Sequence, residues 1–417
     1  MLLLLLACSN VGEPCQGAVA GHGHITESGC AVLPTWAHGE TDPAWETEFQ
    51  VSLTSPMDWN AINAALAQGP VRVVFAPERY DQRIDIQRTD PSENRLLLDG
   101  GTAGARASVP GILTAYEGEP QSYITLRGFE VTGSRDKGVY WRAGDAVILE
   151  DLVVHDNGGS PAINLDYSNR SGHQSSRFVV RNSHVYSQRG ECIYLGGAEG
   201  EDQDSHLRVE VVNNLVHDCT SRLDTRNDGI NVKDRIGEVW VHRNVVARTD
   251  WGIEVASPGE YSQNLVFDTE REGFQISDAF QAFAGEMRFI NNVSLGAGHD
   301  GFHVDTVFET EHLLLFQDNS AFASRDAGLL FGGESPHQVQ LEGMLTAGNG
   351  VGIDGWGTPQ FQGEDCYTAE ETSVDRAAEG LACEPVSVQV PSELAGADGL
   401  YFTEDDPWIL GVGAALY

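Results

Sequence analysis

VEVVNNLV (209–216), followed after a short connection by DGINVKD (228–234), is one copy of a phrase that returns through the middle of the chain. Each copy has an apolar alternation ending in Asn, a short apolar stretch, a turn, and a Gly that opens another alternating segment. The recurrent Asn positions are 20 to 31 residues apart, a spacing typical of stacked structural repeats. They are Asn182, Asn213, Asn244, Asn264, Asn292 and Asn319.

The copies consist of short stretches with the period-2 alternation of β-strands and lack the periodicity of a helix. Strands that recur in the same direction in every repeat must pair in parallel, so the sequence predicts an all-β solenoid of about ten coils. With about 4.8 Å between coils, the rod would be roughly 50 Å long. We expect the Asn residues to occupy a left-handed bend and their amides to bond from coil to coil, with Gly128 and Asp151 at the same place in earlier coils.

The span from about residue 58 to residue 357 resembles a right-handed parallel β-helix of the pectate lyase-like type, and the handedness is implied by this resemblance. At its start, DWNAINAALAQG (58–69) predicts a short amphipathic helix with Ile62 and Leu66 on one side, followed by the strand VRVVFAP (71–77). Similar helices cap the N-terminal end of such solenoids. The fold carries lyases, hydrolases, epimerases, adhesins and inert scaffolds, so the resemblance implies an architecture and leaves the activity open.

The N-terminal sequence MLLLLLACSN (1–10) resembles a bacterial lipobox, in which the Cys becomes lipid-modified after cleavage. It predicts a mature protein that begins at Cys8 and is extracytoplasmic, either anchored by lipid to the outer membrane or secreted. The apolar run is too short to span a bilayer. The basic residues that normally precede such a run are missing, and a plain secretory signal is the alternative.

The chain divides into a signal remnant (1–7), a leader (8–48), the solenoid (49–357) and a C-terminal tail (358–417). The last coil of a solenoid needs a cover, and this is the role that we predict for the tail.

Seven cysteines fit an oxidising compartment, because removal of Cys8 by lipidation leaves an even number. The candidate disulfide pairs, grouped by their order in the sequence, are Cys15 with Cys30, Cys192 with Cys219, and Cys366 with Cys383. Cys192 and Cys219 fall in neighbouring coils, where they could form a bridge or simply be two small buried side chains.

Charge limits the choice of partners. The chain has 62 Asp and Glu against 25 Lys and Arg, a formal net charge of −37, which argues against nucleic acid as a partner. A solvated, salt-tolerant surface accounts for most of the excess. Calcium is the cofactor that such a chain could hold, and without an EF-hand loop its ligands must come from different coils. We expect a monomer.

Superposing the strands that follow the recurrent Gly assigns each residue to a side of the coil. If Ile193, Ile230 and Ile253 point inward, the next residue in each strand points outward. The outward row is Tyr194, Asn231, Glu254, Gln275, His303 and Leu330, and the turn before the strand contributes Glu191, Asp228, Trp251, Glu272 and Asp300. This polar face with aromatic neighbours predicts a sugar-binding groove that includes Tyr194, Asn231, Trp251 and Glu254. An ordinary hydrated solenoid face would also be polar.

The densest group on this face is DGINVKDR (228–235). Glu191 and Asp228 take equivalent turns of adjacent coils, about 4.8 Å apart, so one calcium ion could bind both, with Asp234 as a further ligand. Lys233 would then remove the proton beside a uronate carboxylate, if Arg235 and the metal favoured its neutral form. The alternative is a salt-bridged surface cluster.

The sequence therefore predicts a β-helix lipoprotein that binds or cleaves polysaccharide, with a calcium-assisted uronate lyase favoured. Its candidate catalytic residues are Lys233, Arg235 and, next in order, His303. A glycoside hydrolase is the second enzyme class, with Glu254 paired with Asp228 or Asp305 as its acids. A rod that binds glycans without cleaving them remains the third alternative.

Overall fold

The structure is a computed structural model of the 417-residue chain. It describes residues 23–26, 29–32, 44–102, 104–114, 120–167, 177–197, 208–220, 227–233, 236–277, 285–305, 313–332, 338–355, 360–369 and 384–386. In these parts of the chain, no helix is long and apolar enough to cross a membrane.

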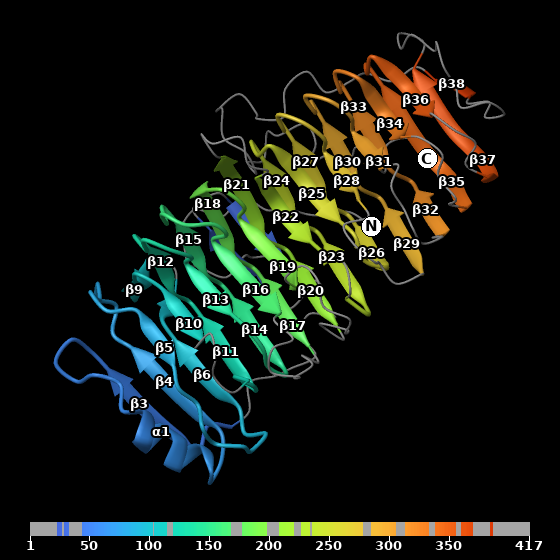
Figure 1. Ribbon diagram of the computed structural model, residues 1–417. Helices are drawn as coiled ribbons and strands as arrows, with labels where there is room; N and C mark the ends of the chain where they lie inside the picture. Colours follow the sequence, from blue (N-terminus) through green and yellow to red (C-terminus); the bar gives the residue numbers. More distant parts are fainter. Residues whose placement is uncertain are drawn as a thin grey trace.

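The chain winds into a rod of parallel strands, with each strand paired to its equivalent in the next coil (Figure 1). One sheet of eleven strands consists of β5 (Ile84–Ile86), β10 (Ile112–Thr114), β13 (Val139–Trp141), β16 (Ile163–Tyr167), β19 (Ile193–Gly197), β22 (Asp228–Val232), β25 (Trp251–Val255), β28 (Phe274–Ile276), β31 (Phe302–Val304), β34 (Ala327–Phe331) and β36 (Val351–Gly355). We call it the first sheet. It contains the strands that follow the recurrent Gly.

Two further runs of parallel strands close each coil. One comprises β3 (Thr47–Val51), β4 (Val71–Phe75), β6 (Leu96–Asp99), β11 (Ile124–Arg127), β14 (Val147–Glu150), β17 (Phe178–Arg181), β20 (Val209–Val212), β23 (Val239–His242), β26 (Gly259–Ser262), β29 (Glu286–Ile290) and β32 (Leu313–Gln317), and we call it the second sheet. The other comprises β9 (Ser108–Val109), β12 (Glu130–Thr132), β15 (Val153–His155), β18 (His184–Arg189), β21 (Leu215–Thr220), β24 (Val245–Ala247), β27 (Leu265–Phe267), β30 (Val293–Leu295) and β33 (Ser320–Phe322). The long strand β35 (Gln338–Ala347) pairs with both runs.

The remaining strands lie at the ends or in short hairpins. After β35, the strands β37 (Gln360–Ala369) and β38 (Glu384–Val386) continue the parallel pairing. The antiparallel pairs are β1 (Gly23–Thr26) with β2 (Gly29–Val32), and β7 (Gly101–Thr102) with β8 (Ala105–Arg106). The all-β, right-handed parallel β-helix predicted from the sequence is confirmed.

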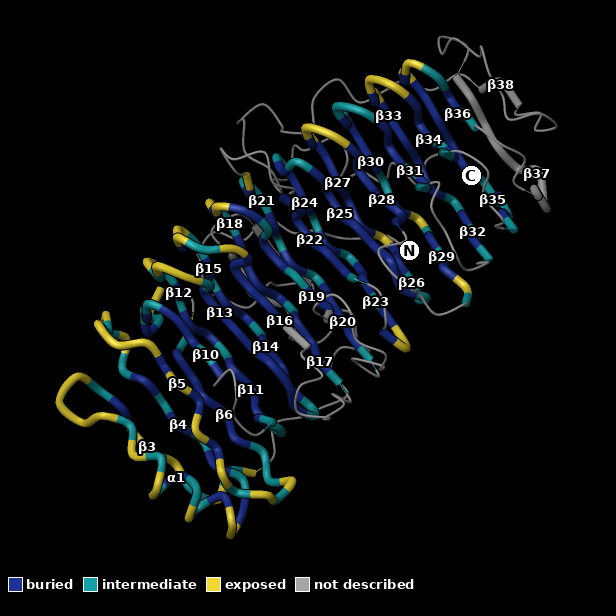
Figure 2. The backbone as a smooth tube through the Cα atoms, in the orientation of Figure 1, coloured by how far each residue is buried: buried dark blue, intermediate teal, exposed yellow. Residues whose placement is uncertain are grey.

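The predicted inward and outward assignment is confirmed by the strand register. Ile193 pairs with Ile230, Ile230 with Ile253, and the line continues through Phe274, Phe302 and Leu329, all buried. Figure 2 shows buried residues along the strands and exposed residues mainly at the corners. Phe274 and Phe302 stack with their ring centroids 4.6 Å apart, so the core is a column of like side chains repeated from coil to coil.

Buried asparagines form a ladder along one corner of the rod, and the prediction is confirmed for Asn244, Asn264, Asn292 and Asn319. It was wrong by one residue in the preceding coil, where Asn214 joins the ladder in place of Asn213. The side chain of each ladder residue donates to the amide oxygen of the next at 2.9 to 3.0 Å, from Asn214 through Asn244, Asn264 and Asn292 to Asn319. The expected backbone conformation was correct only for Asn182 and Asn213, whose φ values are 55° and 56°.

Asn213 is left-handed because it precedes the ladder residue Asn214, and in the later coils the left-handed residue is likewise the one before the ladder Asn. It is Arg243, Gln263, Asn291 or Asp318, with φ between 52° and 56°. The bend therefore sits one residue earlier than the ladder, because the Asn must turn its amide inward to reach the backbone of the neighbouring coil. Gly128 and Asp151 have the positive φ expected of them, 73° and 52°.

Helix α1 (Trp59–Leu66) caps the N-terminal end, as the sequence predicts (Figure 1). The side chain of Asp58 accepts hydrogen bonds from the backbone N–H groups of Asn60 and Ala61, at 2.9 and 3.2 Å, and so begins the helix. Ile62 and Leu66 are buried against the first coils.

Cys192 and Cys219 form a disulfide, which decides between the two alternatives that the sequence left open. It joins the turn before β19 to β21 in the next coil. Of the other cysteines, Cys8, Cys15 and Cys383 lie outside the described residues, and for Cys30 and Cys366 only the backbone is described. Their pairing stays a prediction.

Replacing Asn264 tests the ladder. The Asn264 oxygen accepts from the backbone N–H of Asn244 at 3.0 Å, and its nitrogen donates to the carbonyl of Val241 at 2.9 Å. Asn264→Ala leaves both backbone groups buried without a partner, so the free energy of unfolding in urea should fall by about 2 to 4 kcal/mol. The control is Gln263→Asn, an exposed neighbour whose left-handed backbone suits Asn; an equal loss in both variants would contradict the ladder's role.

Candidate functional site

Five polar residues from three neighbouring coils converge on the outward face of the first sheet. They are Glu191, Asp228, Asn231, Lys233 and Glu254, and we call them the acidic cluster. The register pairs Tyr194 with Asn231 and Asn231 with Glu254, which places these side chains in one row, as the sequence predicts. Parallel pairing alone brings them together, because equivalent positions of adjacent strands lie about 4.8 Å apart.

The amide of Asn231 joins the three carboxyl groups. Its nitrogen donates to Glu191 Oε1 at 3.1 Å, to Glu254 Oε2 at 2.8 Å and to Asp228 Oδ2. Asn231 has no exposed surface, and Asp228 and Glu254 are only 1% and 2% exposed. Three acidic groups thus share one small donor in a buried site.

Lys233 closes the cluster on the solvent side. Its ammonium forms an ion pair with Glu254 Oε2 at 3.0 Å, and 18% of the side chain is exposed. The other oxygen of Glu254 accepts from the Ser277 hydroxyl at 2.8 Å. The Tyr194 ring lies 6.0 Å from the Lys233 nitrogen. Glu254, which the sequence assigned to substrate binding, is therefore the partner of the predicted base.

The three carboxyl groups titrate differently. Burial raises the pKa of Asp228 well above its ordinary value, and the charges of Glu254 and Glu191 raise it further. Burial also raises the pKa of Glu191, although Lys233 opposes the shift. Burial raises the pKa of Glu254, but the charge and hydrogen bond of Lys233 and the hydrogen bonds of Ser277 and Asp228 together outweigh it, and the net shift is downward. The hydrogen bond between Asp228 and Glu254 raises the pKa of Asp228 and lowers that of Glu254.

The acidic cluster has the composition of a calcium site. Hard cations prefer carboxylate and amide oxygens, and the cluster offers three carboxyl groups and one amide. The buried Oδ1 of Asn231 has no hydrogen-bond partner. A half-turn of this amide would put the oxygen, in place of the nitrogen, among the carboxylates. A cation at this place would favour the ionised forms of Asp228 and Glu191 and so oppose the upward shift of their pKa values.

Two predicted site residues, Asp234 and Arg235, lie outside the described residues, so their roles stay predictions. Trp251 pairs in register with Asp228, but its ring lies against the guanidinium of Arg271, 4.5 Å from the ring centroid, and only 9% of the residue is exposed. Tyr194 is half-buried beside Lys233 and is the better placed of the two aromatic residues to meet a ligand.

His303 lies two strands from Glu254 along the outward row and belongs to a second group. Its Nδ1 is 2.9 Å from Asp300 Oδ2 and 3.9 Å from Glu272 Oε1, and these three residues could together hold a metal ion. Burial lowers the pKa of His303, but Asp300 and Glu272 outweigh it and the net shift is upward. From the sequence, Glu272 and Asp300 belong to the same row of turns, but their contact with His303 is seen only in the structure.

Because the pKa of Asp228 is raised, this residue should lower the free energy of unfolding at pH values above the ordinary pKa of an aspartate. There the unfolded chain has lost a proton that the folded state keeps or releases at a cost, so stability falls as pH rises. Asp228→Asn imitates the protonated form, and the variant should be about 1 to 3 kcal/mol more stable than the native protein at pH 8.

The gain should vanish near pH 4, which urea unfolding at both pH values would show. Asp81→Asn, at an exposed aspartate, is the control. A destabilised Asp228→Asn protein at pH 8 would mean that the ionised carboxylate is needed for folding.

No protein-family model and no curated protein matches the sequence. Three solved structures have a similar fold. A GH87 alpha-1,3-glucanase from Streptomyces thermodiastaticus strain HF3-3 is 14% identical over 85% of this chain and 67% of its own, with a TM-score of 0.52. Pectate lyase Pel9A is 13% identical over 87% of this chain and 95% of its own, with a TM-score of 0.44. A mannuronic acid specific polysaccharide family 6 lyase from human gut microbiota is 13% identical over 82% of this chain and 92% of its own, with a TM-score of 0.35. At this identity the likeness shows the parallel β-helix fold alone.

Proposed function

We propose that this protein is a polysaccharide lyase that cleaves uronate-containing chains at the acidic cluster. The observation that carries the proposal is the convergence of three carboxyl groups, one amide and one partly exposed amine on the outward face of a β-helix. The glucanase with a TM-score of 0.52 supports polysaccharide as the substrate class for this fold.

A lyase must neutralise the uronate carboxylate and remove the proton beside it. Calcium at the cluster would supply positive charge for both the bound carboxylate and the negative charge that develops on proton loss. Glu191, Asp228, Glu254 and Asn231 are the residues that would hold it. Their burial keeps water from screening that charge.

Lys233 is the proposed proton acceptor. Lys233 is the basic member of the acidic cluster, and its partial exposure leaves its nitrogen reachable by a substrate. The Lys233 nitrogen contacts Glu254 Oε2 at 3.0 Å. To act as the base, Lys233 must first release its own proton to solvent, and the neutral amine then takes the proton from the uronate. Tyr194, close to the amine, supplies a half-buried aromatic surface for the sugar ring.

A hydrolase using Asp228 and Glu254 is less well supported. The two carboxyl groups of a glycosidase lie at least about 5 Å apart, so that the glycosidic bond fits between them. Asp228 and Glu254 are hydrogen-bonded to each other and to the same amide nitrogen, which leaves no such space. Glu254 with Asp305 remains a possible pair, two strands apart along the rod.

The same proposal places the protein outside the cytoplasm. The Cys192–Cys219 disulfide is of the kind that persists in oxidising compartments. Polysaccharide chains too large to enter a cell are found there. Attachment to a membrane through lipid at Cys8 remains part of the proposal.

Calcium should stabilise the native protein by mass action. If the cluster binds the ion, a concentration of 100 times Kd adds about 2.7 kcal/mol and raises the melting temperature by several degrees. Glu254→Gln should abolish this rise. Asp300→Asn, in the second group of acidic residues, should keep it. A rise lost in Asp300→Asn and kept in Glu254→Gln would place the ion at His303 instead.

Substitution of Lys233 separates a proton acceptor from a simple positive charge. On the acidic polysaccharide that gives ultraviolet absorbance of an unsaturated uronate, both Lys233→Met and Lys233→Arg should reduce kcat by about a hundredfold or more, with KM changed only a few-fold. Lys137→Met, at the only other lysine, is the control.

An active Lys233→Arg enzyme would give Lys233 an electrostatic role only. Reducing ends without the ultraviolet absorbance would identify a hydrolase. Binding without any product from a panel of acidic polysaccharides, with and without calcium, would contradict catalysis and favour a glycan-binding rod.

A further inference from the structure

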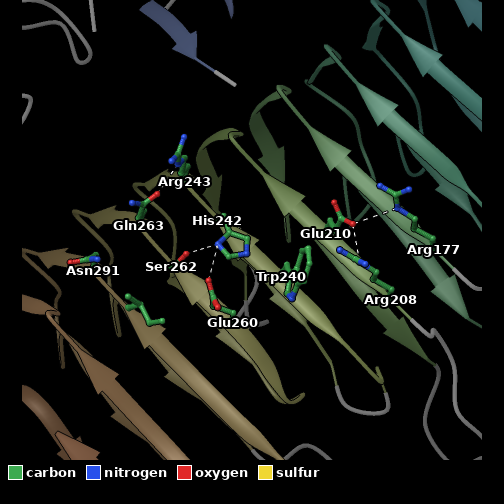
Figure 3. Close-up of a pocket in the computed structure, with 11 residues that line it drawn as sticks. Arg177, Arg208, Glu210, Trp240, His242, Arg243, Glu260, Ser262, Gln263 and Asn291 are labelled. Carbon is green, nitrogen blue, oxygen red and sulfur yellow. Dashed lines mark hydrogen bonds and ion pairs between the residues drawn. The ribbon is translucent and has the colours of Figure 1, made fainter. Parts of the chain in front are cut away.

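A pocket of about 520 Å³ opens on the outward side of the second sheet, away from the acidic cluster (Figure 3). The same coils build both, because β20 and β23 of the second sheet belong to the turns that also contain β22 and β25. We call it the arginine pocket. Its lining includes Arg177, Arg208, Glu210, Trp240, His242 and Arg243.

Positive charge is concentrated in this pocket. Three of the 25 basic residues of a chain with a net charge of −37 line it. Two glutamates also line it, but Glu260 forms an ion pair with Arg288, so Glu210 is the carboxylate that faces the lining arginines. Burial lowers the pKa of His242 to about 4, so the imidazole is neutral at pH 7. Among the described residues, the pocket therefore has a net positive charge.

Two of the arginines form ion pairs with the same glutamate. Arg177 Nε and Arg208 Nε both approach Glu210 Oε1, at 3.4 and 2.9 Å, as Figure 3 shows. The guanidinium of Arg208 also stacks on the Trp240 ring, 3.8 Å from its centroid. Two guanidinium groups around one carboxylate leave a surplus of one positive charge beside an aromatic wall.

This combination fits an acidic sugar. Guanidinium groups bind carboxylates through paired N–H donors, and a half-buried indole offers an apolar surface to a pyranose ring. The volume is within the range of small-molecule sites, about 300 to 1,000 Å³. Glu210 and the neutral polar groups of His242, Ser262 and Gln263 can accept or donate to sugar hydroxyls.

We propose that the arginine pocket binds a uronate residue of a polysaccharide, with its carboxylate on Arg177 and Arg208 and its ring against Trp240. The pocket is a binding site separate from the acidic cluster, and it holds an acidic chain on the rod whether or not the cluster cleaves it.

Titration calorimetry of the full chain with oligogalacturonate and oligomannuronate tests the pocket. The Asp228→Asn background is used so that turnover does not consume the probe. At least one acidic oligosaccharide should bind, with affinity that falls as salt is raised, and a neutral oligoglucan should not. Arg208→Gln and Trp240→Ala should each weaken binding by about tenfold or more.

Arg83→Gln is the matched control, because Arg83 forms an exposed ion pair with Asp85 in the first coils. It should leave the affinity unchanged. Equal affinity in Arg208→Gln, Trp240→Ala and the parent protein would overturn the proposal, as would equal binding of the neutral oligoglucan or tighter binding of a sulfated neutral sugar. Loss of lyase activity in Lys233→Met with pocket binding retained would show that the two sites are independent.

Discussion

Parallel pairing of each strand with its equivalent in the next coil is the constraint on which the rest of this molecule depends. It places equivalent positions of neighbouring coils about 4.8 Å apart along the rod. Each side chain therefore lies against the side chain at the same position in the next coil. Apolar positions become columns, and asparagines become a hydrogen-bonded ladder that satisfies buried backbone groups. The Cys192–Cys219 bridge adds a covalent link between two coils in the same region as the acidic cluster.

The same stacking makes like charges at equivalent positions destabilising. Carboxylates at equivalent positions repel each other, and burial strengthens that repulsion. In the acidic cluster one amide and one amine contact the carboxyl groups, and burial together with the neighbouring carboxylates raises the pKa of Asp228. At pH values above the ordinary pKa of an aspartate, this arrangement lowers the free energy of unfolding. Such a loss of stability is common at functional sites. A cation would neutralise the same carboxylates.

The acidic cluster and the arginine pocket carry opposite net charges on different faces of the coils. The first sheet gathers Glu191, Asp228 and Glu254, whereas the second gathers Arg177 and Arg208 around a single glutamate. A strongly acidic protein that binds acidic chains must overcome its own repulsion, which falls off within about 8 Å at physiological salt. A local surplus of arginine on one face and a cation-binding arrangement on the other would both serve that end.

The sequence alone determined the architecture, the direction of the side chains and which residues belong to the outward row. Alternation with a period of two and the repeat itself can both be read directly from the order of the residues. The sequence also brought Glu191 and Asp228 together. Only the tertiary structure decided that Lys233 pairs with Glu254, that the left-handed bend precedes the ladder Asn, and that Arg177 meets Arg208. These depend on rotamers, burial and protonation, which neighbouring coils set jointly and no single repeat encodes.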